Sequence, residues 1–161
     1  MTMRFETVDR LVIGTVGLPG EREFYLQFES QGQTLSFAME KGQAAALGEK
    51  VRELLREVRR RYGFRAATVP QDDAALSLPV ESEFRILELS ISWSETTERV
   101  ILEGAGEGEE SFSIAVTIDQ AAEFARRTEQ VVSAGRAPCP FCGLPLNIEG
   151  HLCPRANGYR R

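Results

Sequence analysis

The residues best suited to chemistry gather near the C-terminal end of the chain. All three cysteines and the only histidine of the 161 residues lie between positions 139 and 153. Cysteine thiolates and a neutral imidazole are ligands that zinc binds in tetrahedral geometry. Three sulfurs and one nitrogen fill the four positions and leave none for a catalytic water. The sequence therefore predicts a structural Zn²⁺ site of the Cys3His type, with Cys139, Cys142, His151 and Cys153 as its ligands.

The two halves of this ligand set differ in spacing. Cys139 and Cys142 are spaced as in a zinc knuckle, where a tight turn directs two thiolates at one metal, and Gly143 suits the positive φ of that turn. A single residue separates His151 from Cys153, which places both side chains on one face of an extended segment. This second half departs from the common zinc ribbons, although its ligand chemistry is the same.

A redox-active Cys-x-x-Cys pair and inert buried thiols are the alternatives to zinc. A thioredoxin-like motif precedes a long helix, and prolines exclude a long helix here. They stand at Pro138, Pro140, Pro145 and Pro154. Because the segment has few apolar residues, bound metal would supply most of its folding free energy. Zinc is therefore the expected cofactor.

Basic residues follow the last ligand closely. Arg155, Tyr159, Arg160 and Arg161 have little acid nearby, and residues 135–161 carry a net charge of +3. A rigid knuckle that presents arginines and an aromatic ring is suited to RNA or to an acidic protein. Plain solubility of a chain terminus is the alternative explanation.

Two further features could involve anions. Gly14, Gly17 and Gly20 end one expected strand and begin another, so they are typical of a hairpin turn rather than of a phosphate-binding loop. Arg22 and Lys41 could face one another across the expected strands and bind an anion. An enzyme that acts on an anionic, phosphorylated substrate is the function this pair would suggest.

The inventory of catalytic side chains favours a binding protein over an enzyme. General acid–base catalysis usually relies on histidine, and the only histidine is assigned to the metal. Carboxylate pairs such as Asp72-Asp73 lie in polar loops, where we expect them to be solvated. A nucleophile set could be assembled only by dismantling the zinc site, so no catalytic residue is assigned.

The elements that must position these residues follow from hydrophobic periodicity. Alternation predicts strands, and apolar residues at intervals of three and four predict helices. Gly63 should end the first helix, and Thr117 with Gln120 should form a capping box at the start of the second. The expected order is strands over 11–16, 22–28 and 34–39, a helix over 43–62, strands over 84–93, 99–102 and 112–116, and a helix over 118–132.

The same order of elements occurs twice, which suggests an internal duplication. When the sequence is slid along itself by 77 residues, Gln43 falls on Gln120 and the apolar faces coincide. Chance similarity between two amphipathic segments is the alternative. We expect an α+β body of two βββα units, with six antiparallel strands and two helices packed on them, as an open sheet or a barrel. The expected boundaries are a body over 1–135, with repeats at about 8–62 and 83–134 joined by a linker over 63–82, and a zinc-binding tail over 136–161.

Composition indicates an ordinary globular protein. The chain is 42% hydrophobic and 27% charged, with a net charge of −5 and a pI near 5.1, which argues against a generic nucleic-acid binder. Residues 50–65 carry +5, but their arginines alternate with glutamates as on a solvated helix face. We expect a cytoplasmic protein without signal peptide or membrane insertion, in which thiols stay reduced.

Several stretches resemble one protein family. They are Gly14 to Arg22, the helix start at Glu40, Lys41 and Gln43, residues 79–85, and the ending from Cys139 to Arg161. The chain resembles, over almost its whole length, an uncharacterised bacterial family of unknown function with a cysteine-rich terminus. Members tend to be encoded near a phosphoinositide-kinase-like protein and a histidine-phosphatase-like protein. The resemblance implies one domain with a zinc tail, and a protein partner more than a reaction.

These observations lead to one expectation with two alternatives. The chain is expected to be a non-enzymatic adaptor or interaction module that binds a protein partner, and a homodimer is compatible with it. The first alternative is an RNA- or nucleotide-binding protein that uses the basic tail and the patch from Arg56 to Arg65. The second is the enzyme with an anion site at Arg22 and Lys41.

Overall fold

The computed structural model describes residues 2–18 and 20–134. The predicted zinc ligands and the basic residues that follow them lie outside these ranges. The elements in chain order are β1 (Thr2–Phe5), β2 (Arg10–Val16), β3 (Glu23–Ser30), β4 (Gln33–Met39), α1 (Lys41–Tyr62), β5 (Ser82–Arg85), β6 (Glu88–Ser94), β7 (Arg99–Ala105), β8 (Ser111–Val116) and α2 (Ile118–Ser133).

The body is an α+β structure, as expected, but its strands form two sheets of four. The first sheet has the order β2-β3-β4-β5 and the second the order β1-β8-β7-β6. The expectation of six antiparallel strands is wrong, because two short strands add to the described sheets and both pair in parallel. β1 lies beside β8, and β5 lies beside β4. Each short strand thus joins the sheet of the other βββα segment.

The single strand expected over 84–93 is two strands. Phe84 of β5 packs in the core against Phe37 of β4, with ring centroids 4.9 Å apart. The chain then crosses to the other sheet at Ile86, which is buried, and Leu87, which is 57% exposed. Alternation along residues 84–93 places Leu87 on one face with Leu89, Ile91 and Trp93 and predicts that it is buried. Its exposure follows from its place in this crossover, before β6 begins.

The predicted end of α1 and the predicted start of α2 are confirmed, whereas α1 starts two residues earlier and α2 ends one residue later than predicted. In α2, the Thr117 hydroxyl accepts from the Gln120 N–H and the Gln120 side chain accepts from the Thr117 N–H, each at 3.0 Å. α1 ends at Gly63, whose φ of 76° closes the helix with a hydrogen bond from its N–H to the Arg59 carbonyl. Neither helix described here is long and apolar enough to cross a membrane.

A cluster of phenylalanines joins the two sheets. Phe28 and Phe37 of the first sheet both contact Phe112 of the second, with ring centroids 5.7 and 4.5 Å away. Gly104 leaves the space that this packing needs, because a Cβ there would lie 2.4 Å from the Phe112 ring. The inner faces of both sheets therefore form one continuous core.

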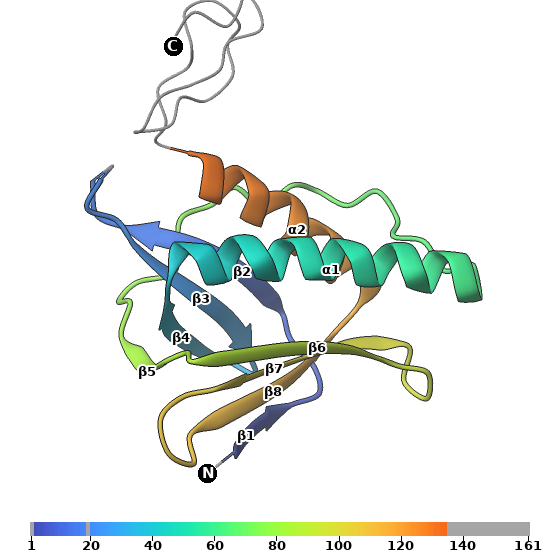
Figure 1. The fold of residues 1–161 in the computed structure, drawn as a ribbon, viewed down its shortest axis with the longest axis horizontal. Helices are drawn as coiled ribbons and strands as arrows, with labels where there is room; N and C mark the ends of the chain where they lie inside the picture. Colours follow the sequence, from blue (N-terminus) through green and yellow to red (C-terminus); the bar gives the residue numbers. More distant parts are fainter. Residues whose placement is uncertain (1, 19, 135–161) are drawn as a thin grey trace, which may run out of the picture.

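The helices lie side by side above the sheets (Figure 1) and cover their outer strands. α2 lies against β2, and α1 lies against β6. Both helix starts are tied to the chain that leads into these strands. The Gln43 side chain donates to the Ile86 carbonyl at 3.0 Å, and the Gln120 side chain donates to the Val8 carbonyl at 2.5 Å. Covered strands offer fewer free backbone groups for unwanted pairing.

Candidate functional site

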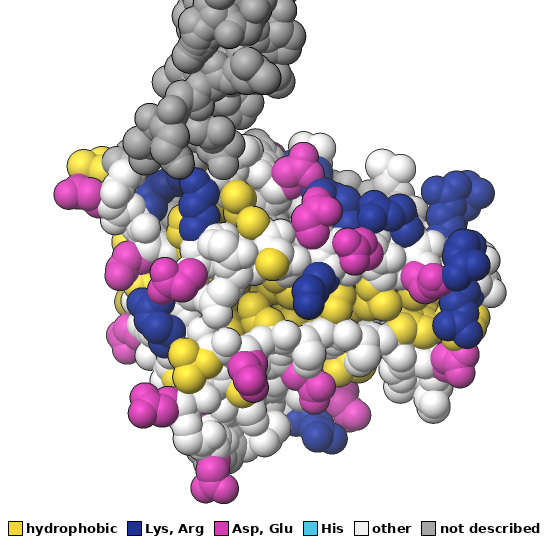
Figure 2. Space-filling model, viewed as in Figure 1, with side chains coloured by type: hydrophobic (Ala, Val, Ile, Leu, Met, Phe, Trp, Pro, Cys, Tyr) yellow, Lys and Arg dark blue, Asp and Glu magenta, His cyan; other side chains and the backbone are white. Residues whose placement is uncertain are grey.

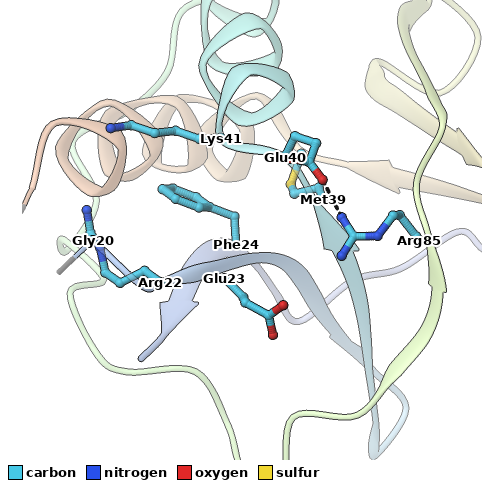
Figure 3. Close-up of a pocket in the computed structure, with 8 residues that line it drawn as sticks. All are labelled: Gly20, Arg22, Glu23, Phe24, Met39, Glu40, Lys41 and Arg85. Carbon is cyan, nitrogen blue, oxygen red and sulfur yellow. Dashed lines mark hydrogen bonds and ion pairs between the residues drawn. The ribbon is translucent and has the colours of Figure 1, made fainter. Parts of the chain in front are cut away.

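A basic pocket opens at the start of α1. It has a volume of about 370 Å³ and brings together both residues of the predicted anion pair, Arg22 and Lys41. Figure 3 shows the side chains of Arg22 and Lys41 on one side of the pocket, with the Phe24 ring beside them and Arg85 on the other side. The lining residues are Gly20, Arg22, Glu23, Phe24, Met39, Glu40, Lys41 and Arg85.

Arg22 connects this pocket to the end of α2. Its guanidinium donates to the Ala134 carbonyl at 2.5 Å and lies 5.7 Å from the centre of the Phe24 ring. Ala134 is the residue at which α2 is capped and at which the described part of the chain ends. The pocket therefore lies at the root of the C-terminal segment that carries the predicted zinc ligands.

Lys41 occupies an electrostatically unfavourable position. It is the first residue of α1, where the aligned peptide dipoles give the helix end a partial positive charge. The first turn of α1 contains no acidic residue, and the carboxylate of the N-cap residue Glu40, which lies next to Lys41 in the sequence, pairs with Arg85. Among the described residues, no hydrogen bond or ion pair engages the Lys41 ammonium group. A bound anion would relieve the repulsion that this cation creates at the helix end.

Arg85 is the third basic residue that lines the pocket, and it was not predicted as a site residue. It reaches the pocket from β5 and donates to the Glu40 carboxylate at 2.6 Å. The parallel pairing of β5 with β4 sets Arg85 opposite Ala38, close to the start of α1. Residues 79–85 were noticed as a motif, but only the parallel pairing reveals which elements Arg85 faces.

The described residues include no cysteine and no histidine, since both types occur only between 139 and 153. Cys139, Cys142, His151 and Cys153 lie outside the described residues, as do Arg155, Tyr159, Arg160 and Arg161. No group of three or more potential metal ligands occurs within residues 2–18 and 20–134. The donor set of three thiolates and one imidazole nevertheless fits the chemistry of zinc.

A second polar cluster, which the sequence did not reveal, surrounds Asp72. The Arg10 guanidinium donates to both carboxylate oxygens of Asp72, at 2.7 and 3.0 Å. Arg127, only 5% exposed, donates to the carbonyls of Ile13, Asp72 and Ala74 at 2.6 to 2.9 Å. The expectation that Asp72 is merely solvated is therefore wrong, because two arginines hold it.

The electrostatics of the Asp72 cluster are those of a structural site. The hydrogen bond from Arg10 lowers the pKa of the Asp72 carboxyl, and the hydrogen bond from Arg126 lowers the pKa of Glu123. Burial lowers the pKa of Arg127. A carboxylate whose pKa is lowered is a poor general base near neutral pH. The cluster fixes the linker between α1 and β5 to β2 and α2.

Both signs of charge are spread over the visible face (Figure 2). Arginines gather at the end of α1, where Arg59, Arg60 and Arg61 form the last turn. Part of this helix is laced with ion pairs, as expected, since Arg52 pairs with Glu49 and Arg60 with Glu57. Acidic side chains are spread over the lower part of the view, where β6, β7 and β8 lie.

Comparison with known proteins gives one match. The model of the family described as "Protein of unknown function (DUF3090)" matches residues 3–153. No curated protein and no solved structure matches the chain. The matched range covers most of the 161 residues and reaches Cys153, the last predicted metal ligand. The resemblance to a family of unknown function is thus confirmed, and the chain belongs to the DUF3090 family.

Proposed function

We propose that the chain is a non-enzymatic adaptor that binds a protein partner through a zinc-holding C-terminal tail. One observation carries the proposal. Every cysteine and histidine of the chain occurs in a single short stretch, in numbers and types that complete a tetrahedral zinc shell. In this proposal Cys139, Cys142, His151 and Cys153 would hold Zn²⁺. The ion would order the segment that bears Arg155, Tyr159, Arg160 and Arg161.

The arrangement of the body supports this role. α2 leads directly into the tail, and α2 is held by its packing on α1 and β2 and by the hydrogen bonds of the buried Arg127. The bond from Arg22 to the Ala134 carbonyl fixes the last described residue before the tail. A binding segment presented from a fixed root loses less conformational freedom when it meets a partner.

Capture of partners from a native lysate tests the proposal. Full-length wild-type chain is compared with Cys139→Ser, which removes one ligand, and with Asn147→Ser, a control within the same stretch. We expect a defined protein to be retained after nuclease treatment by wild type and Asn147→Ser, and lost with Cys139→Ser. Retention of RNA that is lost in moderate salt would instead favour nucleic-acid binding, because phosphate contacts depend steeply on salt. Retention of neither would contradict the adaptor function.

A second candidate function, binding of a phosphate-type anion, rests on the basic pocket. Arg22, which directly precedes β3, Lys41 of α1 and Arg85 of β5 line this pocket, and Lys41 adds its charge to the positive end of α1. This pocket is also where an enzyme acting on an anionic, phosphorylated substrate would bind it.

The chain offers a matched test of the anion site. Its only two lysines, Lys41 and Lys50, both lie on α1. Inorganic phosphate binding is measured by calorimetry for wild type, Lys41→Gln and Lys50→Gln. We expect Lys41→Gln to weaken binding several-fold and Lys50→Gln to leave it unchanged. Equal weakening in both variants would mean that phosphate responds to net charge alone.

A further inference from the structure

The linker that follows α1 covers the outer face of the first sheet. Leu76 is 7% exposed and lies over Gly14 of β2, and the Ser77 backbone exchanges two hydrogen bonds with the Gln27 side chain, at 2.9 and 3.0 Å. Asp72 fixes the linker to Arg10 and lies against Arg127 of α2. The middle of the outer face of this sheet is thus covered by the segment between α1 and β5.

The two sheets can be compared row by row from their strand registers. In the first sheet, Val12, Gln27 and Ser36 are neighbours across β2, β3 and β4. In the second sheet, Ser90, Glu103 and Ser113 are neighbours across β6, β7 and β8, and Arg4 of β1 follows. The rows are equivalent, because Leu26 faces Ile13 and Phe37 as Leu102 faces Ile91 and Ile114.

Equivalent positions differ sharply in burial. Val12, Gln27 and Ser36 are at most 2% exposed beneath the linker. Ser90, Glu103 and Arg4 are exposed, and Ser113 is half-buried. A hollow of about 610 Å³ lies over this part of the second sheet, lined in part by Arg4, Ser90 and Glu103. No described segment of the chain covers the second sheet as the linker covers the first.

Residues 135–161, which lie outside the described residues, suit this hollow in three respects: the helix from which they start, their length and their charge. The linker over 63–81 starts where α1 ends, and residues 135–161 form a longer segment that starts where α2 ends. Residues 88–110, which include β6 and β7, contain seven glutamates and one arginine. Residues 135–161 contain four arginines and one glutamate. Opposite charges favour their association.

We propose that the C-terminal segment, residues 135–161, docks in cis on the outer face of the second sheet, over the row formed by Ser90, Glu103, Ser113 and Arg4. The basic residues of the segment meet the acidic second sheet there, in the place that the linker occupies on the first. This inference rests on the proposed metal-holding tail and deepens it. Without a partner the tail is bound to the body, and a protein partner competes with the second sheet for the basic surface of the tail.

Cobalt substitution of the full-length chain tests this docking. Co²⁺ takes tetrahedral thiolate and imidazole ligands, and its visible and thiolate charge-transfer absorption reports occupancy of the site. Its paramagnetism shifts the NMR signals of nearby amides relative to the zinc form. We expect larger shifts for Ser90, Glu103 and Ser113 than for Val12, Gln27 and Ser36. Equal or smaller shifts in the second sheet would overturn the proposal.

Charge reversal provides the matched variants. Glu103→Arg lies in the row, whereas Glu53→Arg makes the same change on the exposed side of α1. Glu103→Arg should keep the cobalt absorption and reduce the shifts in the row several-fold, and Glu53→Arg should preserve both. If the two variants behave alike, the row is not the docking site.

Two further outcomes separate the possible failures. If the wild-type chain with Co²⁺ lacks thiolate-to-cobalt absorption, the metal site of the proposed function is refuted, and the docking with it. Normal absorption without selective shifts in the second sheet would refute the docking alone. Shifts that arise only when isotope-labelled zinc chain is mixed with unlabelled cobalt chain would place the tail on a second copy and overturn docking in cis.

Discussion

Replacement of Asp72 by asparagine tests whether the linker is fixed by charge. The change keeps the size of the side chain but removes the charge that receives two hydrogen bonds from Arg10 and faces Arg127 at 3.4 Å. Charge-assisted hydrogen bonds contribute about 1.5–3 kcal/mol each when fully buried. The Asp72 side chain is 28% exposed, so solvent screens part of that energy. We expect a net loss of about 2 kcal/mol in the free energy of unfolding.

Asp73 is the control for this variant, because it is the next residue and allows the same substitution. Its side chain is 55% exposed and, among the described residues, its carboxylate pairs with Arg126 at 2.7 Å. An exposed pair contributes less than about 1 kcal/mol. Urea unfolding followed by circular dichroism should show a lower midpoint for Asp72→Asn than for Asp73→Asn, with an unchanged slope. Equal destabilisation of the two variants would refute the role of the Asp72 cluster.

Three further predictions concern acid stability, core packing and the C-terminal tail. First, the pKa values of Asp72 and Glu123 are lowered in the folded chain. The stability that these carboxylates contribute is therefore complete above their unfolded pKa of about 4, and it is lost as the pH falls through their folded pKa values. The difference in unfolding free energy between wild type and Asp72→Asn, measured by urea unfolding, should narrow below about pH 4. Second, Gly104→Ala should destabilise the folded chain by about 1–3 kcal/mol, because the added Cβ would meet the Phe112 ring. Gly42→Ala on α1, whose Cβ would have no atom within 4 Å, should be neutral or stabilise the chain by up to about 1 kcal/mol. Thermal melts of both variants check this, and a neutral Gly104→Ala would contradict the packing. Third, Cys139→Ser should leave the cooperative unfolding of the body intact, because the described residues form a continuous hydrophobic core among themselves. Loss of the transition in calorimetry would show that the tail is part of the core.

Hydrophobic periodicity predicts most of the secondary structure, because α1 and α2 each bury one apolar stripe and the longer strands alternate. Leu47, Val51 and Val58 of α1 are buried as their spacing indicates. Hydrophobic periodicity does not predict the short strands. β1 and β5 have four residues each and pair in parallel with strands far along the chain. Four residues are too few for a clear alternation, and parallel pairing leaves no turn signal between partners.

The same distinction applies to the candidate site residues: those beside long elements can be predicted from the sequence, and those on short strands or in the linker cannot. Arg22 and Lys41 can be grouped from the sequence, because each stands next to a predicted strand or helix of one antiparallel unit. Arg85 and Asp72 cannot, because their partners depend on where β5 and the linker settle after α1. Asp72 stands between two polar residues in the sequence, Gln71 and Asp73, and only the approach of Arg10 and Arg127 reveals its role. Long-range contacts of loops leave no periodic pattern.

The metal content of the purified full-length chain tests the central claim most directly. Protein isolated without chelator is analysed by elemental mass spectrometry, and its accessible thiols are counted in parallel. The proposal predicts one zinc per chain in wild type, three protected thiols, and loss of the metal in Cys139→Ser. A wild-type chain that carries zinc in fewer than half of its molecules and exposes three reactive thiols would contradict it.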